Sequence, residues 1–114
     1  MVATLMGKAT VLFDGRVGSQ SMHIWLEWRG GDVVLSSQEL GPALVPYFGE
    51  DEIEVFLTVE AAHLPQLARA LGCQPTSGSI EAALVDRYHG DSSAASHLSA
   101  LLEEHDIRHE YFVV

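Results

Sequence analysis

The chain has 114 residues and a formal net charge of −10, because 16 Asp and Glu oppose only six Lys and Arg. That length fits a single domain, residues 1–114, in which residues 1–7 are a candidate disordered segment. A surface this acidic repels nucleic acid and anionic membrane, so we expect direct contact with neither, whereas basic proteins are attracted. The same charge would also serve simply to keep a small protein in solution.

Cysteine content and hydropathy further restrict the class of protein to which the chain can belong. The lone Cys73 excludes an internal disulfide and argues against a zinc site built on cysteines. The first eight residues lack the features of a signal peptide, and no apolar run approaches the roughly 20 residues that span a bilayer. The sequence therefore predicts a cytoplasmic protein, and neither a cofactor nor a metal is expected.

The first half of the chain begins with strand patterns. Residues 8–14 predict a first strand, and residues 15–19 predict a loop. Residues 22–28 alternate, which places Trp25 and Glu27 on the face opposite to the more apolar side chains of this strand.

Turn signals and a second alternating run follow. The pair Gly30-Gly31 predicts a hairpin that leads into a strand at residues 33–35. Residues 37–48 have helical spacing interrupted by prolines, so a short helix is expected to begin near Pro42. Residues 53–59 form the clearest strand pattern of the chain.

The second half changes to a helical period. Its apolar stripes predict three helices, over residues 64–71, 80–88 and 94–105. Ser77 or Ser79 would cap the second helix, and Ser92 or Ser93 the third. Residues 107–114 return to a strand pattern.

The predicted fold class is α+β, with the element order β-β-β-(α)-β-α-α-α-β. This order favours an antiparallel sheet of about five strands with three to four helices packed on one face. The last strand is expected to return beside the strand at residues 53–59.

Two acidic clusters are candidate partner-binding sites. The first surrounds the start of a strand and comprises Glu50, Asp51, Glu52 and Glu54. Carboxylates this close repel one another unless a cation or a basic partner relieves the repulsion, and this cluster lacks the ligand spacing of a calcium loop. The second cluster ends the last helix, where acid opposes the helix dipole, and comprises Glu103, Glu104 and Asp106. A solvated strand edge is the commoner explanation of the first cluster, and a compensated, solvated helix end fits the second cluster as well as a partner site does.

Two aromatic residues are further candidates for a partner interface. Exposed Trp and Tyr carry much of the binding energy of protein interfaces, which singles out Trp25 and Tyr47, although burial is the commoner fate of such side chains. Among the six histidines, His105 and His109 have the spacing of a helical ligand pair. We expect the helix to end between them, and His105 to complete an apolar stripe instead.

No catalytic motif is present, and no catalytic residue is assigned. If the chain is instead a small enzyme or a ligand-binding domain, its site forms only in three dimensions. The first candidates for such a site are His23, Glu27, His89 and His109.

Short segments along most of the chain carry a resemblance. They are Trp25–Trp28, Ser37–Gly41, Thr58-Val59, Leu64-Pro65, Ala70–Gly72, Leu102–Ile107 and Glu110–Phe112. With these segments the chain resembles small bacterial proteins of the toxin-immunity type, such as those of actinobacteria. The resemblance implies a non-catalytic cytosolic protein that covers the active site of a cognate toxin, and it transfers no binding residues.

The leading hypothesis is therefore a non-catalytic binding or inhibitor protein that neutralises a basic toxin through an acidic surface. A nuclease or a nucleobase-modifying enzyme is the expected partner, because such enzymes hold nucleic acid in positively charged clefts. The alternatives are the enzyme or ligand-binding domain, an acidic mimic of nucleic acid, and a structural subunit.

Overall fold

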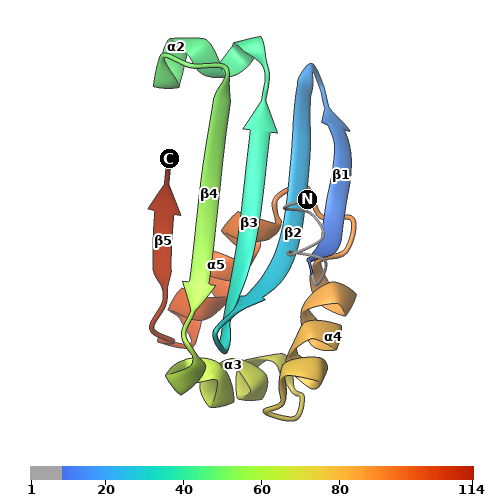
Figure 1. Ribbon diagram of the computed structural model, residues 1–114, viewed down its shortest axis with the longest axis vertical. Helices are drawn as coiled ribbons and strands as arrows, with labels where there is room; N and C mark the ends of the chain where they lie inside the picture. Colours follow the sequence, from blue (N-terminus) through green and yellow to red (C-terminus); the bar gives the residue numbers. More distant parts are fainter. Residues whose placement is uncertain (1–8) are drawn as a thin grey trace.

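A computed structural model describes residues 9–114, so the predicted disorder of residues 1–7 lies outside the described residues. Five strands form one antiparallel sheet in the order β1-β2-β3-β4-β5, which makes β1 and β5 its two edges (Figure 1). The strands are β1 (Thr10–Val17), β2 (Gln20–Arg29), β3 (Asp32–Leu40), β4 (Glu52–Val59) and β5 (Glu110–Val113).

The helices follow the predicted order. Between β3 and β4 lie a 3-10 turn (Pro42–Leu44) and the short helix α2 (Val45–Phe48). After β4 and a second 3-10 turn (Ala61–His63) come α3 (Leu64–Leu71), α4 (Ser77–Tyr88) and α5 (Ala94–Glu104). In Figure 1, α5 crosses behind the strands and α3 lies beyond their lower end. The α+β fold class and the element order are confirmed, and the last strand does pair with β4.

The core fills the space between the helices and one face of the sheet. The sheet contributes Ile24, Leu26, Leu35 and Leu57, and the helices contribute Leu67, Ile80, Leu84, Leu98 and Leu102, all almost fully buried. Burying a side chain of this size contributes about 1.5–3 kcal/mol, so these residues decide which face of each element points inward. The opposite face of the sheet, turned away from α5, is called the open face.

Two strands are longer than predicted. Gly15 to Val17 continue β1 instead of forming a loop, because a two-residue turn in which Gly18 adopts a φ of 64° suffices to connect β1 to β2. β3 runs on to Leu40 although its last residues have helical spacing, since both β2 and β4 pair with it there. Pairing with neighbouring strands overrides this local pattern.

The predicted serine caps are also corrected. The Thr76 hydroxyl accepts a hydrogen bond from the Ser79 backbone N–H at 3.2 Å, so Thr76 and neither predicted serine caps α4. Ser93 occupies the N-cap position of α5, but its side chain makes no capping hydrogen bond. α5 ends at Glu104, which leaves His105 exposed and not in an apolar stripe. None of the helices in residues 9–114 is both long and apolar enough to cross a membrane.

Candidate functional site

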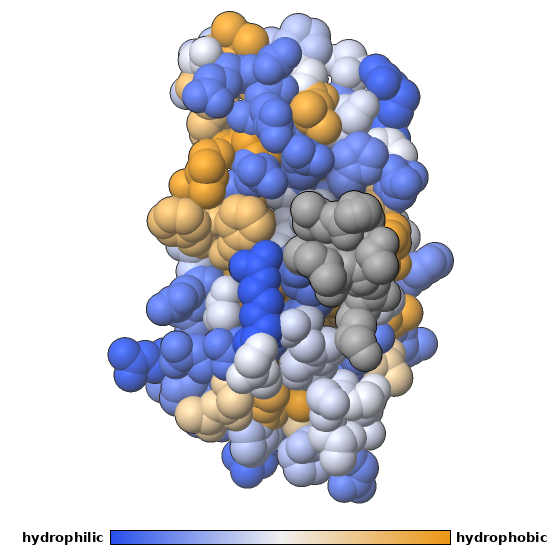
Figure 2. Space-filling model, viewed as in Figure 1, coloured by the Kyte–Doolittle hydropathy of each residue, from blue (hydrophilic) through white to orange (hydrophobic). Residues whose placement is uncertain are grey.

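Strand pairing builds one row of side chains across the open face. From β1 to β5 the successive partners are Val11, Trp25, Ser36, Phe56 and Phe112. We call this set the aromatic row. Phe112 is 62% exposed, and Trp25 and Phe56 are half-buried. Because Phe112 lies on an edge strand, the row ends in an apolar patch that solvent reaches, and Figure 2 shows apolar side chains gathered over β4 and β5 among hydrophilic ones.

Acidic residues border the aromatic row on both sides. The pairing that runs from Glu27 through Val34 and Thr58 to Glu110 gives one bordering row, in which Glu27 and Val34 are buried and Glu110 is exposed. The other bordering row runs from Asp14 through His23 and Gln38 to Glu54. Glu52 follows Glu54 two positions away on the same face of β4. An apolar centre within a carboxylate border is a surface suited to a basic protein.

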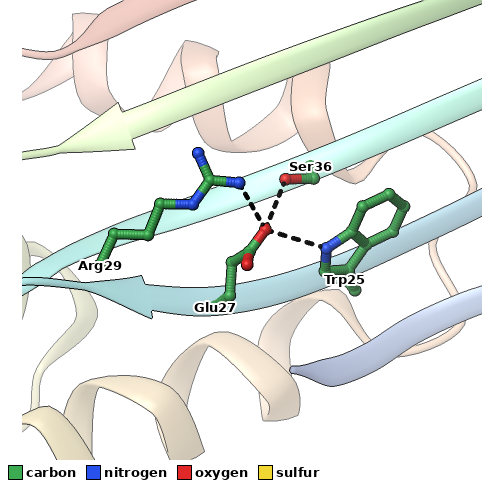
Figure 3. Close-up of polar contacts among 4 residues, drawn as sticks. All are labelled: Trp25, Glu27, Arg29 and Ser36. Carbon is green, nitrogen blue, oxygen red and sulfur yellow. Dashed lines mark hydrogen bonds and ion pairs between the residues drawn. The ribbon is translucent and has the colours of Figure 1, made fainter. Parts of the chain in front are cut away.

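Glu27 is the centre of a polar network beneath this surface (Figure 3). Its side chain is only 7% exposed, and one carboxylate oxygen, Oε1, accepts every hydrogen bond of the network. The donors are the Trp25 indole Nε1 at 3.1 Å, the Arg29 guanidinium at 2.8 Å and the Ser36 hydroxyl at 3.5 Å. A buried carboxylate needs such partners, since an unpaired charge in the interior is costly.

The same network orients the exposed Arg29 and the half-buried Trp25. Arg29 is held by Glu27 and also lies over the Phe56 ring, with its guanidinium carbon 5.8 Å from the ring centroid. Trp25 is fixed through its indole N–H. Fixed aromatic and arginine side chains lose little conformational entropy on binding, and these residue types dominate interface hot spots. The open face is therefore preorganised around these two side chains.

The first acidic cluster lies at one end of this face. Glu52 and Glu54 project from the open face of β4, and the Glu52 carboxylate accepts a hydrogen bond from the Gln38 side chain at 2.7 Å. Glu50 and Asp51 are exposed in the turn that precedes β4. The cluster is continuous with the carboxylate border of the aromatic row.

Tyr47, in the neighbouring helix α2, is not buried. Its side chain is 83% exposed, and α2 contains no buried residue. The expectation of burial is therefore wrong for Tyr47, because a four-residue helix that follows a proline-rich turn has too few residues to fold its aromatic side chains into the core. Trp25, the other aromatic candidate, is half-buried.

The second acidic cluster lies elsewhere. Glu103 lines a surface hollow together with Tyr111, on the helix side of β5. Tyr111 pairs with Leu57, which is five residues along β4 from Glu52, or roughly 17 Å. Glu104 and Asp106, like Glu103, are exposed at the end of α5. The structure therefore keeps the two acidic clusters apart, on different sides of the sheet.

The four residues proposed for an enzyme site do not converge. His23 contacts the Asp14 carboxylate at 2.6 Å on the open face, and Glu27 is enclosed in the network described above. His89 follows α4 beside β1, since the next residue, Gly90, donates its N–H to the Leu12 carbonyl. His109 contacts the Ile107 carbonyl at 2.8 Å, next to β5 at the opposite edge.

One further polar cluster lies at the start of α5. Asp91 accepts a hydrogen bond from the Ser93 backbone N–H at 2.9 Å and contacts His97 Nδ1 at 2.6 Å. Burial alone raises the pKa of Asp91, but the hydrogen bonds from His97 and Ser93 and the charge of His97 outweigh burial and lower that pKa. Within residues 9–114, no three His, Cys, Asp or Glu side chains are grouped so as to hold a metal ion.

The sequence-based prediction did not identify several residues of the open face. Arg29 and Phe56 share the alternation of Trp25 and of the strand at residues 53–59, so the pattern could have placed each on one side of its strand. Alternation alone does not determine the register that brings Phe56 next to Ser36 and Phe112. No family model, curated protein or solved structure matches the chain.

Proposed function

We propose that this chain is a non-catalytic, cytoplasmic binding protein that holds a basic partner protein on its open face. The observation that carries the proposal is the aromatic row bordered by carboxylates, on the sheet face away from α5. The aromatic side chains and Arg29 supply contact energy, and the carboxylates supply orientation and charge complementarity.

Whole-molecule charge supports a basic partner. With a net charge of −10 the chain attracts a cationic protein over distances near the Debye length, about 8 Å at physiological salt. Electrostatic steering of this kind can raise association rates by about 10–10³-fold. Once bound, fixed groups such as Trp25 set the rate of dissociation.

Inhibition of a basic toxin is the most specific form of this proposal. Nucleases and nucleobase-modifying enzymes bind phosphates in positively charged clefts, and a carboxylate-rich surface competes for those clefts. The resemblance to toxin-immunity proteins, carried by segments such as Trp25–Trp28, supports the same partner class. In this form of the proposal, the chain covers the active site and performs no chemistry.

Capture from a lysate of the native host tests the proposal. The chain is immobilised, bound proteins are eluted with a salt gradient, and two double variants are compared. Glu52→Lys with Glu54→Lys reverses charge on the open face, and Glu103→Lys with Glu104→Lys makes the same charge change at the end of α5. Because both variants change the net charge by the same amount, a difference between them shows that binding depends on a particular surface and not on net charge alone.

The expected result is one stoichiometric basic protein that elutes at high salt from the wild type and from the α5 variant, and is lost from the Glu52/Glu54 variant. The captured protein is then assayed for activity on nucleic acid, which an equimolar amount of the wild-type chain should suppress. Equal retention by both variants, or no basic protein in any eluate, would refute the proposed binding face.

A further inference from the structure

The outer edge of β5 has unused backbone hydrogen-bonding groups. Glu54 and Val114 exchange both of their backbone hydrogen bonds, at 3.3 and 2.9 Å. Hydrogen-bonded pairs alternate along an antiparallel ladder, so Phe112 also points its backbone groups toward β4. The N–H and C=O groups of Tyr111 and Val113 therefore point outward, away from the sheet. In the described part of the chain, no backbone hydrogen bond to these outward groups is recorded.

The other edge of the sheet is protected in ways that β5 is not. β1 has a register shift between Val11 and Phe13, and the Gly90 N–H donates to the Leu12 carbonyl at 2.8 Å. Irregular pairing is a device that keeps edge strands from pairing with other chains. By contrast, all four residues of β5 are exposed and three of them are apolar.

The two sides of the β5 edge favour different side chains in an added strand. On the open face, Phe112 lies between Glu110 and the carboxylates of β4, which favours Lys or Arg through charge pairing and cation–π contact. On the helix side, Tyr111 and Val113 are 48% and 47% exposed and favour apolar side chains. A hollow of about 450 Å³ beside Tyr111 leaves room for a side chain, although Ser96, Ser99 and Glu103 make part of its lining polar.

From this edge we infer that the basic partner adds an extended segment to β5 as a sixth, antiparallel strand. The segment alternates basic and apolar residues, with its basic side chains over the open face and its apolar side chains beside Tyr111 and Val113. Main-chain hydrogen bonds to the outward groups of β5 supply affinity, and the alternation supplies specificity. The inference rests on the proposed function, to which it adds the mode of binding.

The charge of the chain favours an extended basic segment over a second copy of the chain as the strand that pairs with β5. Pairing two copies through β5 would bring together two molecules that each carry a charge of −10, in addition to the carboxylates of Glu54 and Glu110 near this edge. This net repulsion disfavours the association of two copies. A basic segment converts the same carboxylates into favourable partners.

Amide exchange measured by NMR tests the inference on the ¹⁵N-labelled full chain. The probe is a capped heptapeptide of alternating Lys and Val at low ionic strength, and the control is the same peptide with its Val amides N-methylated. At saturation, exchange at the Tyr111 and Val113 amides should slow at least tenfold, while exchange at Phe112, already bonded to β4, changes little. The N-methylated peptide should give no such protection.

A matched pair of variants checks the site. Val113→Pro removes an outward N–H that β4 does not use, and proline is tolerated on a strand edge. It should weaken peptide binding at least tenfold, whereas Val113→Ala, which keeps the N–H, should weaken it less than threefold.

Three outcomes would overturn strand addition: no binding of the peptide, equal binding of both peptides, or equal binding by the two variants. Protection of Tyr111 and Val113 that grows with chain concentration in the absence of peptide would assign the edge to a second copy instead. None of these outcomes bears on capture of a basic protein by the open face. The proposed function is therefore tested separately, by the capture experiment.

Discussion

At the level of single residues, Glu27 has the most demanding environment on the open face. Its side chain is 7% exposed and its oxygen Oε1 accepts hydrogen bonds from Trp25, Arg29 and Ser36. Such a network adds little stability when intact, but removing its centre leaves donors unsatisfied. Glu27 therefore controls how Trp25 and Arg29 are oriented on the open face.

Replacing Glu27 by Ala should lower the free energy of unfolding by about 2 kcal/mol, because the buried Ser36 hydroxyl and the Trp25 indole lose their acceptor. Glu27→Gln, which keeps an acceptor oxygen, should cost less than half as much. Urea denaturation of both variants measures the difference. A loss below about 0.5 kcal/mol for Glu27→Ala would mean that the network does not hold these side chains.

Asp91 gives the chain a pH-dependent contribution to stability. Because the folded-state pKa of Asp91 is lowered, its contribution is complete above the unfolded-state value and is lost as the pH falls through the lower, folded-state value. At pH 5, Asp91→Asn should lower the free energy of unfolding by about 0.5 kcal/mol, because the amide still accepts from the Ser93 N–H but no longer carries the charge that pairs with His97. At pH 2.5 the two proteins should differ less. An unchanged difference between these pH values would contradict the assignment.

At the level of elements, the turn after β3 depends on a glycine. A Cβ on Gly41 would overlap the side-chain amide of Gln20. Gln20 is 9% exposed, and its Oε1 accepts a hydrogen bond from the Ala43 N–H at 3.3 Å. The Gln20 side chain therefore cannot move aside without losing this link between β2 and the turn.

Gly41→Ala should lower the free energy of unfolding by about 2 kcal/mol through this overlap. The control is Gly78→Ala in the first turn of α4, where a Cβ meets nothing within 4 Å. That change should stabilise the protein by up to about 1 kcal/mol, because Ala favours the helix. Thermal unfolding of both variants measures the contrast, and equal shifts of the two midpoints would contradict it.

The elements themselves were largely predictable. Alternation identified β2 and β4. The Gly30-Gly31 pair identified the hairpin turn from β2 to β3, because both glycines adopt the positive φ that such a turn needs. The ends were less predictable. β1 continues through Gly15 to Val17, and Thr76 replaces the predicted serine caps of α4, since pairing partners and capping geometry depend on neighbours that a single sequence does not identify.

The open face was predictable only in part. Strand alternation placed Trp25 and Glu27 on one side of β2, and the structure agrees. Their link to Phe56 and Phe112 depends on the register of three strand pairs, one of which joins segments more than 50 residues apart. The exposure of Tyr47 was missed because residue type alone favours burial.

At the level of the whole molecule, the net charge of −10 makes the folded chain repel itself. Added NaCl should therefore raise the midpoint of thermal unfolding, since salt screens exposed charges. Glu103→Lys with Glu104→Lys, which reduces the net charge by four units, should show a smaller rise than the wild type. Differential scanning calorimetry between low and moderate salt measures both. A midpoint that falls with salt in the wild type would contradict this account.

The most direct test of the central claim is an NMR footprint of the captured basic partner on the ¹⁵N-labelled chain. The largest shift changes should fall on the Trp25 indole N–H and on the amides of Phe56 and Phe112, while the amides of Glu104 and Asp106 stay unchanged. A footprint centred on the end of α5, with the open face unchanged, would contradict it.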